Sequence, residues 1–158
     1  MAEVPIVLTV MGYRPVVGGG GSDRLSRHWD LAPQPESASA ARQQVGSACA
    51  DWGLDGEVRE DALLIVSELV SNVVDHAGTL CHLRVRVDGE GLRIEVRDFY
   101  RCPPPQPRPI DLGARRGRGL QVVSALSLRW GVTEFDDGKS VWSVLAVPAA
   151  ASMPPAVR

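Results

Sequence analysis

Residues 68–77, with the sequence ELVSNVVDHA, constrain most strongly what this chain can fold into. They lie late in a segment, beginning near Glu57, whose apolar residues recur at helical spacing. Because a helix advances about 100° per residue, residues four apart share a face, which brings Glu68 and Asn72 side by side. A helix this apolar is mostly buried, so its carboxylate and carboxamide need a partner or a ligand. Taken alone, the stretch fits equally well a surface helix with one polar stripe.

The length and charge of the chain exclude several classes of protein. Its 158 residues, 44% of them apolar, suffice for one domain with one core. The formal net charge of -2 gives no electrostatic reason to expect nucleic acid or an anionic membrane as a partner. An apolar run at residues 4–10 has no basic residue before it and is too short to span a membrane. We therefore expect neither a signal peptide nor an anchor.

The three cysteines, Cys49, Cys81 and Cys102, lack the spacing of metal ligands or of a redox pair. An odd number of widely spaced cysteines is most simply explained as free thiols in a reducing compartment. We therefore expect a cytoplasmic protein.

Composition shifts divide the chain into an N-terminal extension at residues 1–24, a domain at residues 25–148 and a tail at residues 149–158. The extension ends in a run of glycines typical of a flexible linker, and the tail is rich in alanine and proline. Within the domain, the sequence predicts a strand at residues 27–31 and helices at residues 36–52 and 57–76. Ser37 or Ser39 is expected to cap the first helix, and Gly78 to end the second. Seven apolar residues are the expected core contacts of the second helix: Leu64, Ile65, Val66, Leu69, Val70, Val73 and Val74.

Residues 83–98 alternate between apolar and charged side chains, which predicts a hairpin with one buried and one charged face. Gly89, Glu90 and Gly91 form the expected turn, and the second strand ends at Asp98. Two sets of side chains alternate: Leu83, Val85, Val87, Leu92, Ile94 and Val96 on the buried face, and Arg84, Arg86, Asp88, Arg93, Glu95 and Arg97 on the charged face.

An irregular stretch with five prolines, residues 99–116, follows this hairpin. Prolines exclude a central strand or a helix there, and a long irregular stretch in a compact domain is usually functional or mobile. Helical spacing resumes at Leu120, and residues 128–147 predict a second hairpin that turns at residues 136–138.

Glycines stand between the irregular stretch and the helix that follows it, at Gly117 and Gly119. Glycine backbone can approach a phosphate closely, and a helix N-terminus presents free N–H groups to an anion. Arg115, Arg116 and Arg118 would add positive charge. Each feature also has an ordinary explanation, because glycines punctuate many loops and an aspartate such as Asp98 often ends a strand.

Five pieces in order carry a family resemblance: ELVSNVVDHA, a hairpin ending in Asp98, GRGL, RWGV and GKSVW. Together they resemble the GHKL ATPase superfamily, and within it the small anti-sigma-factor serine kinases and their actinobacterial relatives. The resemblance runs from about Trp29 to Val147. It implies an α+β fold of the Bergerat type: a two-layer α/β sandwich with a mixed, mainly antiparallel sheet, helices on one face, and ATP held between helices and a lid.

The resemblance also implies roles for individual residues. Asn72 matches the asparagine that ligates the Mg²⁺ bridging the phosphates, and Glu68 matches the carboxylate proposed as general base. Asp98 matches the aspartate that accepts a hydrogen bond from the adenine amino group. The remaining residues implied at the nucleotide are Asp75, His76, Arg116, Gly117, Arg118, Gly119, Leu120 and Ser140. Among these, Gly117 and Gly119 match lid glycines, Ser140 matches a hydroxyl that supports the adenine contact, and His76 is expected to be structural.

One departure concerns the residues after Asp98, where the wider superfamily has glycines. Here Phe99 and Tyr100 follow, and Pro103 stands nearby. The actinobacterial relatives often share this replacement, so it changes the expected wall beside the adenine and the affinity for nucleotide, not the expected fold.

Two functions fit the resemblance. The first is a kinase that uses Mg·ATP to phosphorylate a small anti-anti-sigma (switch) partner and that holds a sigma factor inactive. The second is a nucleotide-gated protein-binding module without useful phosphotransfer. Retention of Glu68 favours the kinase. Dimerisation is left open by the sequence, and a nucleic-acid binder is disfavoured because a basic face and stacking aromatics are lacking.

Overall fold

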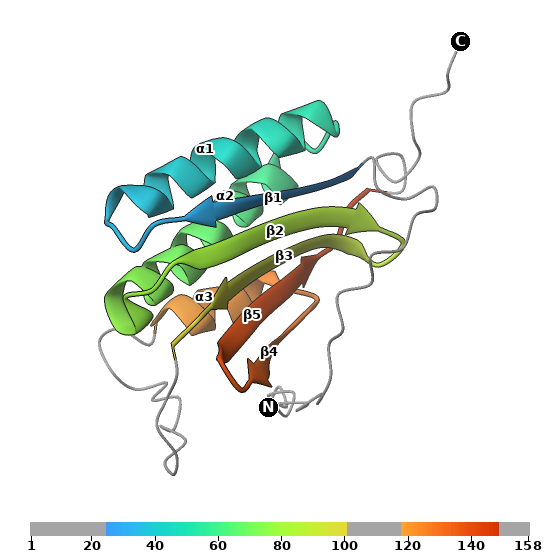
Figure 1. Cartoon of the computed structure of the whole chain (residues 1–158). Helices are drawn as coiled ribbons and strands as arrows, with labels where there is room; N and C mark the ends of the chain where they lie inside the picture. The colour runs from blue at the N-terminus through green and yellow to red at the C-terminus, as the bar shows by residue number, and fades with distance from the viewer. Residues whose placement is uncertain (1–24, 101–117, 149–158) are drawn as a thin grey trace, which may run out of the picture.

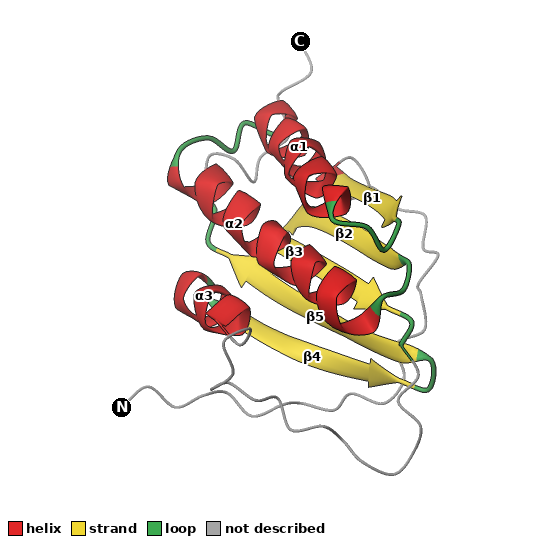
Figure 2. Ribbon diagram, turned by 90° about the vertical axis from the view of Figure 1, so that its left-hand side faces the viewer, coloured by secondary structure: helices red, strands yellow, loops and turns green. Residues whose placement is uncertain are grey.

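The computed structural model describes residues 25–100 and 118–148. In these residues a five-stranded antiparallel sheet carries three α-helices on one face (Figures 1 and 2). The strands are β1 (Ser26–Leu31), β2 (Cys81–Asp88), β3 (Gly91–Asp98), β4 (Arg129–Phe135) and β5 (Gly138–Leu145), in the spatial order β1-β2-β3-β5-β4. The helices are α1 (Glu36–Asp51), α2 (Glu57–Asn72) and α3 (Arg118–Leu126), and a π-helical turn, η2 (Val73–Ala77), continues α2.

The fold class predicted from the sequence is confirmed. Helices cover one face of the sheet, which we call the helix face, and leave the other, the open face, without a helix from the described residues (Figure 2). The sheet was expected to be mixed and mainly antiparallel, and every described strand pair is antiparallel. No helix in the described part of the chain is long and apolar enough to cross a membrane.

The alternation in residues 83–98 produces both faces, as predicted. Leu83 pairs with Val96 and Val85 with Ile94 across β2 and β3, and the helices bury all four. Neighbouring charged residues such as Arg84 and Glu95 point to the open face because successive side chains of a strand alternate. The core therefore lies between the sheet and helices α1 and α2.

Helix α1 begins as predicted at Glu36, but its expected serine cap is wrong. The N-cap position is Pro35, and no side chain caps the helix. The Ser37 hydroxyl instead donates to the Ala32 carbonyl at 2.6 Å, which ties the helix to the end of β1. A serine inside the first turn can reach back to the preceding chain, and sequence spacing does not distinguish the two uses.

The second helix differs from the prediction at its end and on one face. The α-helix ends at Asn72 instead of His76, because the Gly78 N–H donates to the Val73 carbonyl, five residues back, at 2.9 Å. Such wider turns are frequent at functional sites. Gly78 then adopts a left-handed conformation with φ of 61°, which suits glycine. Leu64, an expected core residue, is 45% exposed.

Candidate functional site

The polar pair on α2 lies against the start of α3. A Cβ atom added to Gly119 would lie 2.8 Å from Glu68 Oε2 and 3.3 Å from Asn72 Nδ2. A side chain at Gly119 would push the end of the flexible Glu68 side chain aside, so the start of α3 lies directly against the pair. The end of α2 and the start of α3 are far apart in the sequence, and they meet at the Glu68–Asn72 pair.

Asp98 is the second polar feature of the helix face. Its side chain lies on that face because it continues the series of Ile94 and Val96 along β3, and the residue is only 3% exposed. Its Oδ1 accepts hydrogen bonds from the backbone N–H of Lys139 and of Tyr100, each at 3.2 Å. A buried carboxylate needs such donors, and these two fix its orientation.

Glycine in the β4–β5 turn makes the approach to Asp98 feasible. Gly138 has a φ of 153°, and a Cβ atom there would lie 2.2 Å from the Asp98 carbonyl oxygen. Any other residue at this position would collide with the backbone of β3. The turn can therefore bring the Lys139 N–H to the carboxylate.

Thr79 connects the end of η2 to the end of β3, and sequence reasoning missed it. Its hydroxyl oxygen accepts a hydrogen bond from the Phe99 N–H at 3.1 Å. This hydrogen bond attaches Phe99, the residue after Asp98, to the turn that follows η2. A threonine in a turn gives no sequence signal for this contact, because its partner lies 20 residues away.

Ser140, expected to support the adenine contact, lies on the other face of the sheet. It pairs with Arg97 in the register of β3 and β5, so both side chains point to the open face. Its hydroxyl donates to Glu95 Oε1 at 2.6 Å. A one-residue difference along a strand changes the face, and the strand register decides this, not the motif order. Lys139 is the β5 residue that contacts Asp98, through its backbone.

The other predicted nucleotide residues fall in three places. Asp75 and His76 are exposed on η2. Leu120 packs against the core from α3, and Arg118 begins that helix. Arg116 and Gly117, like the rest of residues 101–117, lie outside the described residues, as do the extension at residues 1–24 and the tail at residues 149–158.

The residues on the helix face fit the groups that the resemblance implies. Asn72 offers a carboxamide oxygen beside the Glu68 carboxylate, and hard cations such as Mg²⁺ take oxygen ligands together with phosphates. Asp98 is a buried acceptor of the kind that selects an exocyclic amine. Among the described residues, no group of three or more histidine, cysteine and acidic side chains is placed to hold a metal by itself.

Comparison with known proteins supports the family and the fold. The model of the histidine kinase-like ATPase domain family matches residues 31–144. An uncharacterized protein of Streptomyces coelicolor is 35% identical over 80 residues, which cover 48% of this chain and 76% of that protein.

Among solved structures, the RsbU and RsbW domains of a Mycobacterium tuberculosis protein share the fold, with a TM-score of 0.59 and 21% identity. The match covers 76% of this chain and 32% of the mycobacterial chain, so this chain spans about a third of that structure. Domains of the family bind ATP, typically with Mg²⁺. The family model spans most of the chain, and the fold agrees with it, so the protein belongs to the histidine kinase-like ATPase domains of the GHKL superfamily.

Proposed function

We propose that this domain is a Mg·ATP-dependent serine/threonine protein kinase of the anti-sigma-factor type. The observation that carries the proposal is that Asp98, buried and held by two backbone N–H groups, shares the helix face of the sheet with the Glu68–Asn72 pair. A nucleotide bound on this face would need an acceptor for its base, which Asp98 offers, and polar groups near its phosphates, which the Glu68–Asn72 pair offers.

Each residue has a separate task in this proposal. Asp98 accepts a hydrogen bond from the adenine amino group, and its two backbone donors keep the carboxylate aimed. Asn72 supplies an oxygen to Mg²⁺, which when bound neutralises charge on the phosphates. Glu68 takes the proton from the attacking hydroxyl of the substrate. Gly119 leaves space at the start of α3, where helix N–H groups face an anion.

The proposed partner is a small anti-anti-sigma protein with a phosphorylatable serine or threonine, and the second partner is a sigma factor held inactive. The support comes from the fold shared with a structure described as containing an RsbW domain, together with the retained Glu68. Localisation in the cytoplasm follows from this role and is part of the proposal.

A second candidate is a nucleotide-gated binding module without phosphotransfer. It is favoured by one observation, the replacement of glycines after Asp98 by Phe99 and Tyr100. Phe99 is attached to Thr79 by its backbone, so the wall beside the adenine is built differently. In this alternative ATP would order the binding surface, and Glu68 would have no proton to take.

The test pairs Glu68→Gln with Asn72→Ala, which lie one helical turn apart. Purified wild type and both variants are incubated with Mg·ATP and a co-purifying switch protein, and binding and phosphate transfer are measured separately. We expect Asn72→Ala to lose Mg²⁺-dependent ATP binding. Glu68→Gln should keep ATP binding but lose about 10²–10⁴-fold in transfer, because only its basicity is removed.

Two outcomes would contradict the kinase. If the wild type binds ATP and partner but transfers no phosphate, the gated module stands instead. If Glu68→Gln transfers phosphate as fast as the wild type, Glu68 is not the base.

A further inference from the structure

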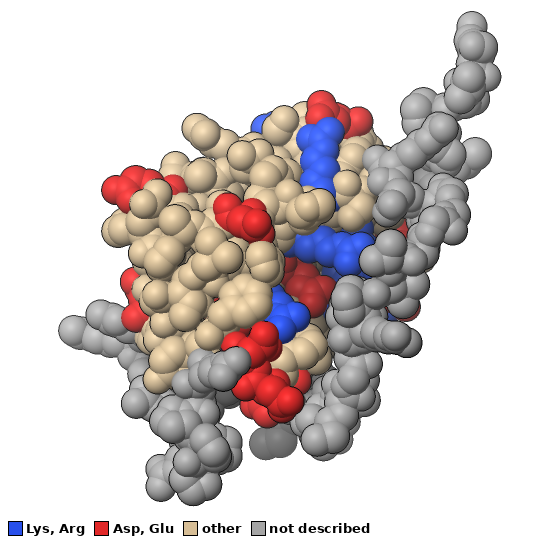
Figure 3. Space-filling model, in the orientation of Figure 1, with Lys and Arg blue, Asp and Glu red and all other residues tan. Residues whose placement is uncertain are grey.

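Four arginines project from the paired strands β2 and β3 onto the open face of the sheet. Arg84 and Arg86 come from β2, and Arg93 and Arg97 from β3, each with its side chain partly buried. Basic side chains interspersed with acidic ones are visible along the middle of the space-filling view (Figure 3). No helix of the described residues covers this face.

The strand register brings like charges together here. Arg86 lies directly opposite Arg93, while Arg84 lies opposite Glu95. Like charges at directly opposed positions destabilise a sheet. Glu95 Oε2 lies 3.6 Å from Arg93 Nε. The other carboxylate oxygen of Glu95, Oε1, accepts a hydrogen bond from the Ser140 hydroxyl. One glutamate therefore serves several donors.

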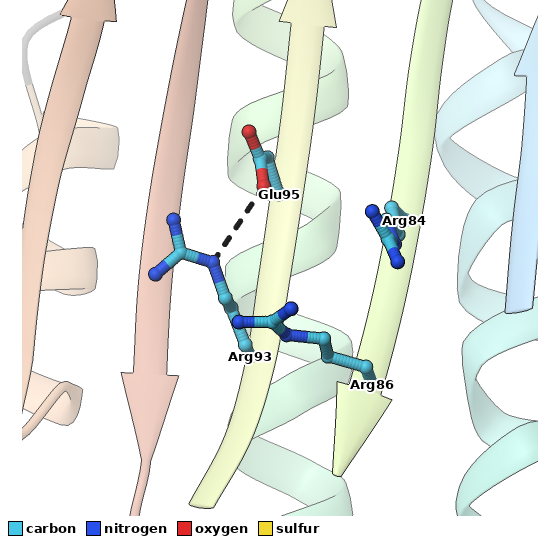
Figure 4. A pocket seen from close by; sticks show the side chains of 4 residues that line it. All are labelled: Arg84, Arg86, Arg93 and Glu95. Atoms are coloured by element: carbon cyan, nitrogen blue, oxygen red, sulfur yellow. Dashed lines mark ion pairs between the residues drawn. The ribbon is translucent and has the colours of Figure 1, made fainter. Parts of the chain in front are cut away.

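These side chains enclose a groove. Arg84, Arg86, Arg93 and Glu95 line a cavity of about 150 Å³ between β2 and β3 (Figure 4). A second cavity of about 120 Å³ shares Arg84 and Glu95 with the first and adds three further lining residues: His82, Arg97 and Phe135. We call the two together the arginine groove, which follows the strands from Arg86 to Phe135.

Aromatic rings hold two of the guanidinium groups in place. Arg93 stacks over Trp142 at 4.5 Å from the ring centre, and Arg97 over Phe135 at 4.1 Å. A guanidinium stacked by its flat side keeps its edge available for hydrogen bonds to a carboxylate. The Arg97 Nε–H is buried and has no hydrogen-bond partner among the described residues. The Arg97 side chain is 30% exposed, so a ligand would meet its other nitrogens, of which Nη2 donates to Asp137 Oδ1 at 2.7 Å.

We propose that the arginine groove binds an extended acidic segment of a partner protein. Carboxylates pair with guanidinium groups through two parallel hydrogen bonds, and the groove follows the strands over a length that suits an extended chain more than a single ion. A second copy of this chain fits poorly, because face-to-face pairing would bring arginines against arginines. Three of the arginines also pair with acidic side chains of this chain, Arg86 with Asp88, Arg93 with Glu95 and Arg97 with Asp137, and an acidic segment would compete with these pairs.

The proposed docking face is opposite the one that carries Asp98, so it is independent of the nucleotide. The test measures fluorescence anisotropy of a labelled oligoglutamate peptide against the full chain at low ionic strength. We expect the double variant Arg86→Gln/Arg93→Gln to weaken binding at least about tenfold. The matched control Arg42→Gln/Arg59→Gln, on the helices, should leave it unchanged, and so should Asp98→Asn.

Circular dichroism melting shows whether each variant is folded, and Arg84→Gln is the second variant should the double variant not fold. Four results would overturn the proposal. The first is equal weakening by the control pair, and the second is equal binding of an oligolysine peptide. The third is displacement by inorganic phosphate but not by chloride at the same ionic strength, which would indicate a small-anion site. The fourth is a sedimenting dimer that the double variant abolishes.

Discussion

The two faces of the sheet are made by alternate residues of the same strands, β2 and β3, yet they are stabilised by different interactions. On the helix face, Leu83, Val85 and Ile94 are completely buried under α1 and α2. On the open face, arginines are arranged by ion pairs and by stacking on Trp142 and Phe135. Burial supplies most of the free energy of folding, whereas partly exposed ion pairs contribute little. The open face is therefore free to be specialised for recognition without loss of the fold.

The same contrast applies to the two kinds of carboxylate. Asp98, on the helix face, is buried and held by backbone N–H groups, while the partly exposed Asp137 accepts a hydrogen bond from the Arg97 side chain at 2.7 Å. A carboxylate held by the fold is suited to select a ligand, because its donors do not move when the ligand binds. A carboxylate held by a side chain can exchange partners.

The largest expected difference between the faces is in stability. Leu83→Ala removes a fully buried side chain from the helix face and should lower the free energy of unfolding by about 2–5 kcal/mol. Arg84→Ala, the next residue on the open face, should cost less than about 1 kcal/mol. Urea denaturation of both variants measures the two costs. Equal costs would show that the open face is also covered, by a part of the chain or by another molecule.

A smaller difference is expected in nucleotide affinity. Asp98→Asn keeps an oxygen for the two backbone donors but turns one acceptor of the adenine amino group into a donor. ATP binding should weaken by about 1–3 kcal/mol, the cost of a mismatched buried polar group. Asp137→Asn is the matched control on the open face and should leave the affinity unchanged. Calorimetry with ATP and GTP decides: equal binding of both nucleotides by the wild type would contradict the role of Asp98.

The weakest of the three effects is a pH dependence of stability that comes from two thiols on the helix face. Burial raises the pKa of Cys49 and of Cys81, both in the core under the helix face, from the usual 9.0 to about 11. The folded state thus holds these protons to higher pH than the unfolded state. The contribution of these thiols to the free energy of unfolding is fully present below pH 9.0 and is lost as the pH rises toward about 11. The loss at pH 10 is about 1 kcal/mol per thiol.

Urea denaturation at several pH values between 8 and 11, compared with a Cys49→Ala/Cys81→Ala variant, isolates this contribution from tyrosine and lysine. The wild type should lose more stability than the variant. Parallel pH profiles would show that the thiols titrate alike in the folded and unfolded states.

Features that depend on local periodicity and residue type could be predicted from the residues alone. Alternation at residues 83–98 predicted the hairpin and its two faces, and spacing of four predicted that Glu68 and Asn72 share a helix face. These results were available because strands and helices repeat at fixed intervals within one segment. The family resemblance rested on the order of five sequence motifs, and it predicted Asp98 and Gly119 as residues at the nucleotide.

Contacts between residues of different segments became known from the three-dimensional fold. It placed Gly119 against Glu68, attached Phe99 to Thr79, and put Ser140 on the open face instead of beside Asp98. It also ended the α-helix at Asn72 and set Arg86 opposite Arg93. The helix end follows from a local backbone hydrogen bond between Gly78 and Val73. The other results follow from contacts between distant segments or from the register of paired strands. Alternation within one hairpin predicted its two faces, but it could not place Ser140 of β5 relative to β3, because a shift of one residue exchanges the faces.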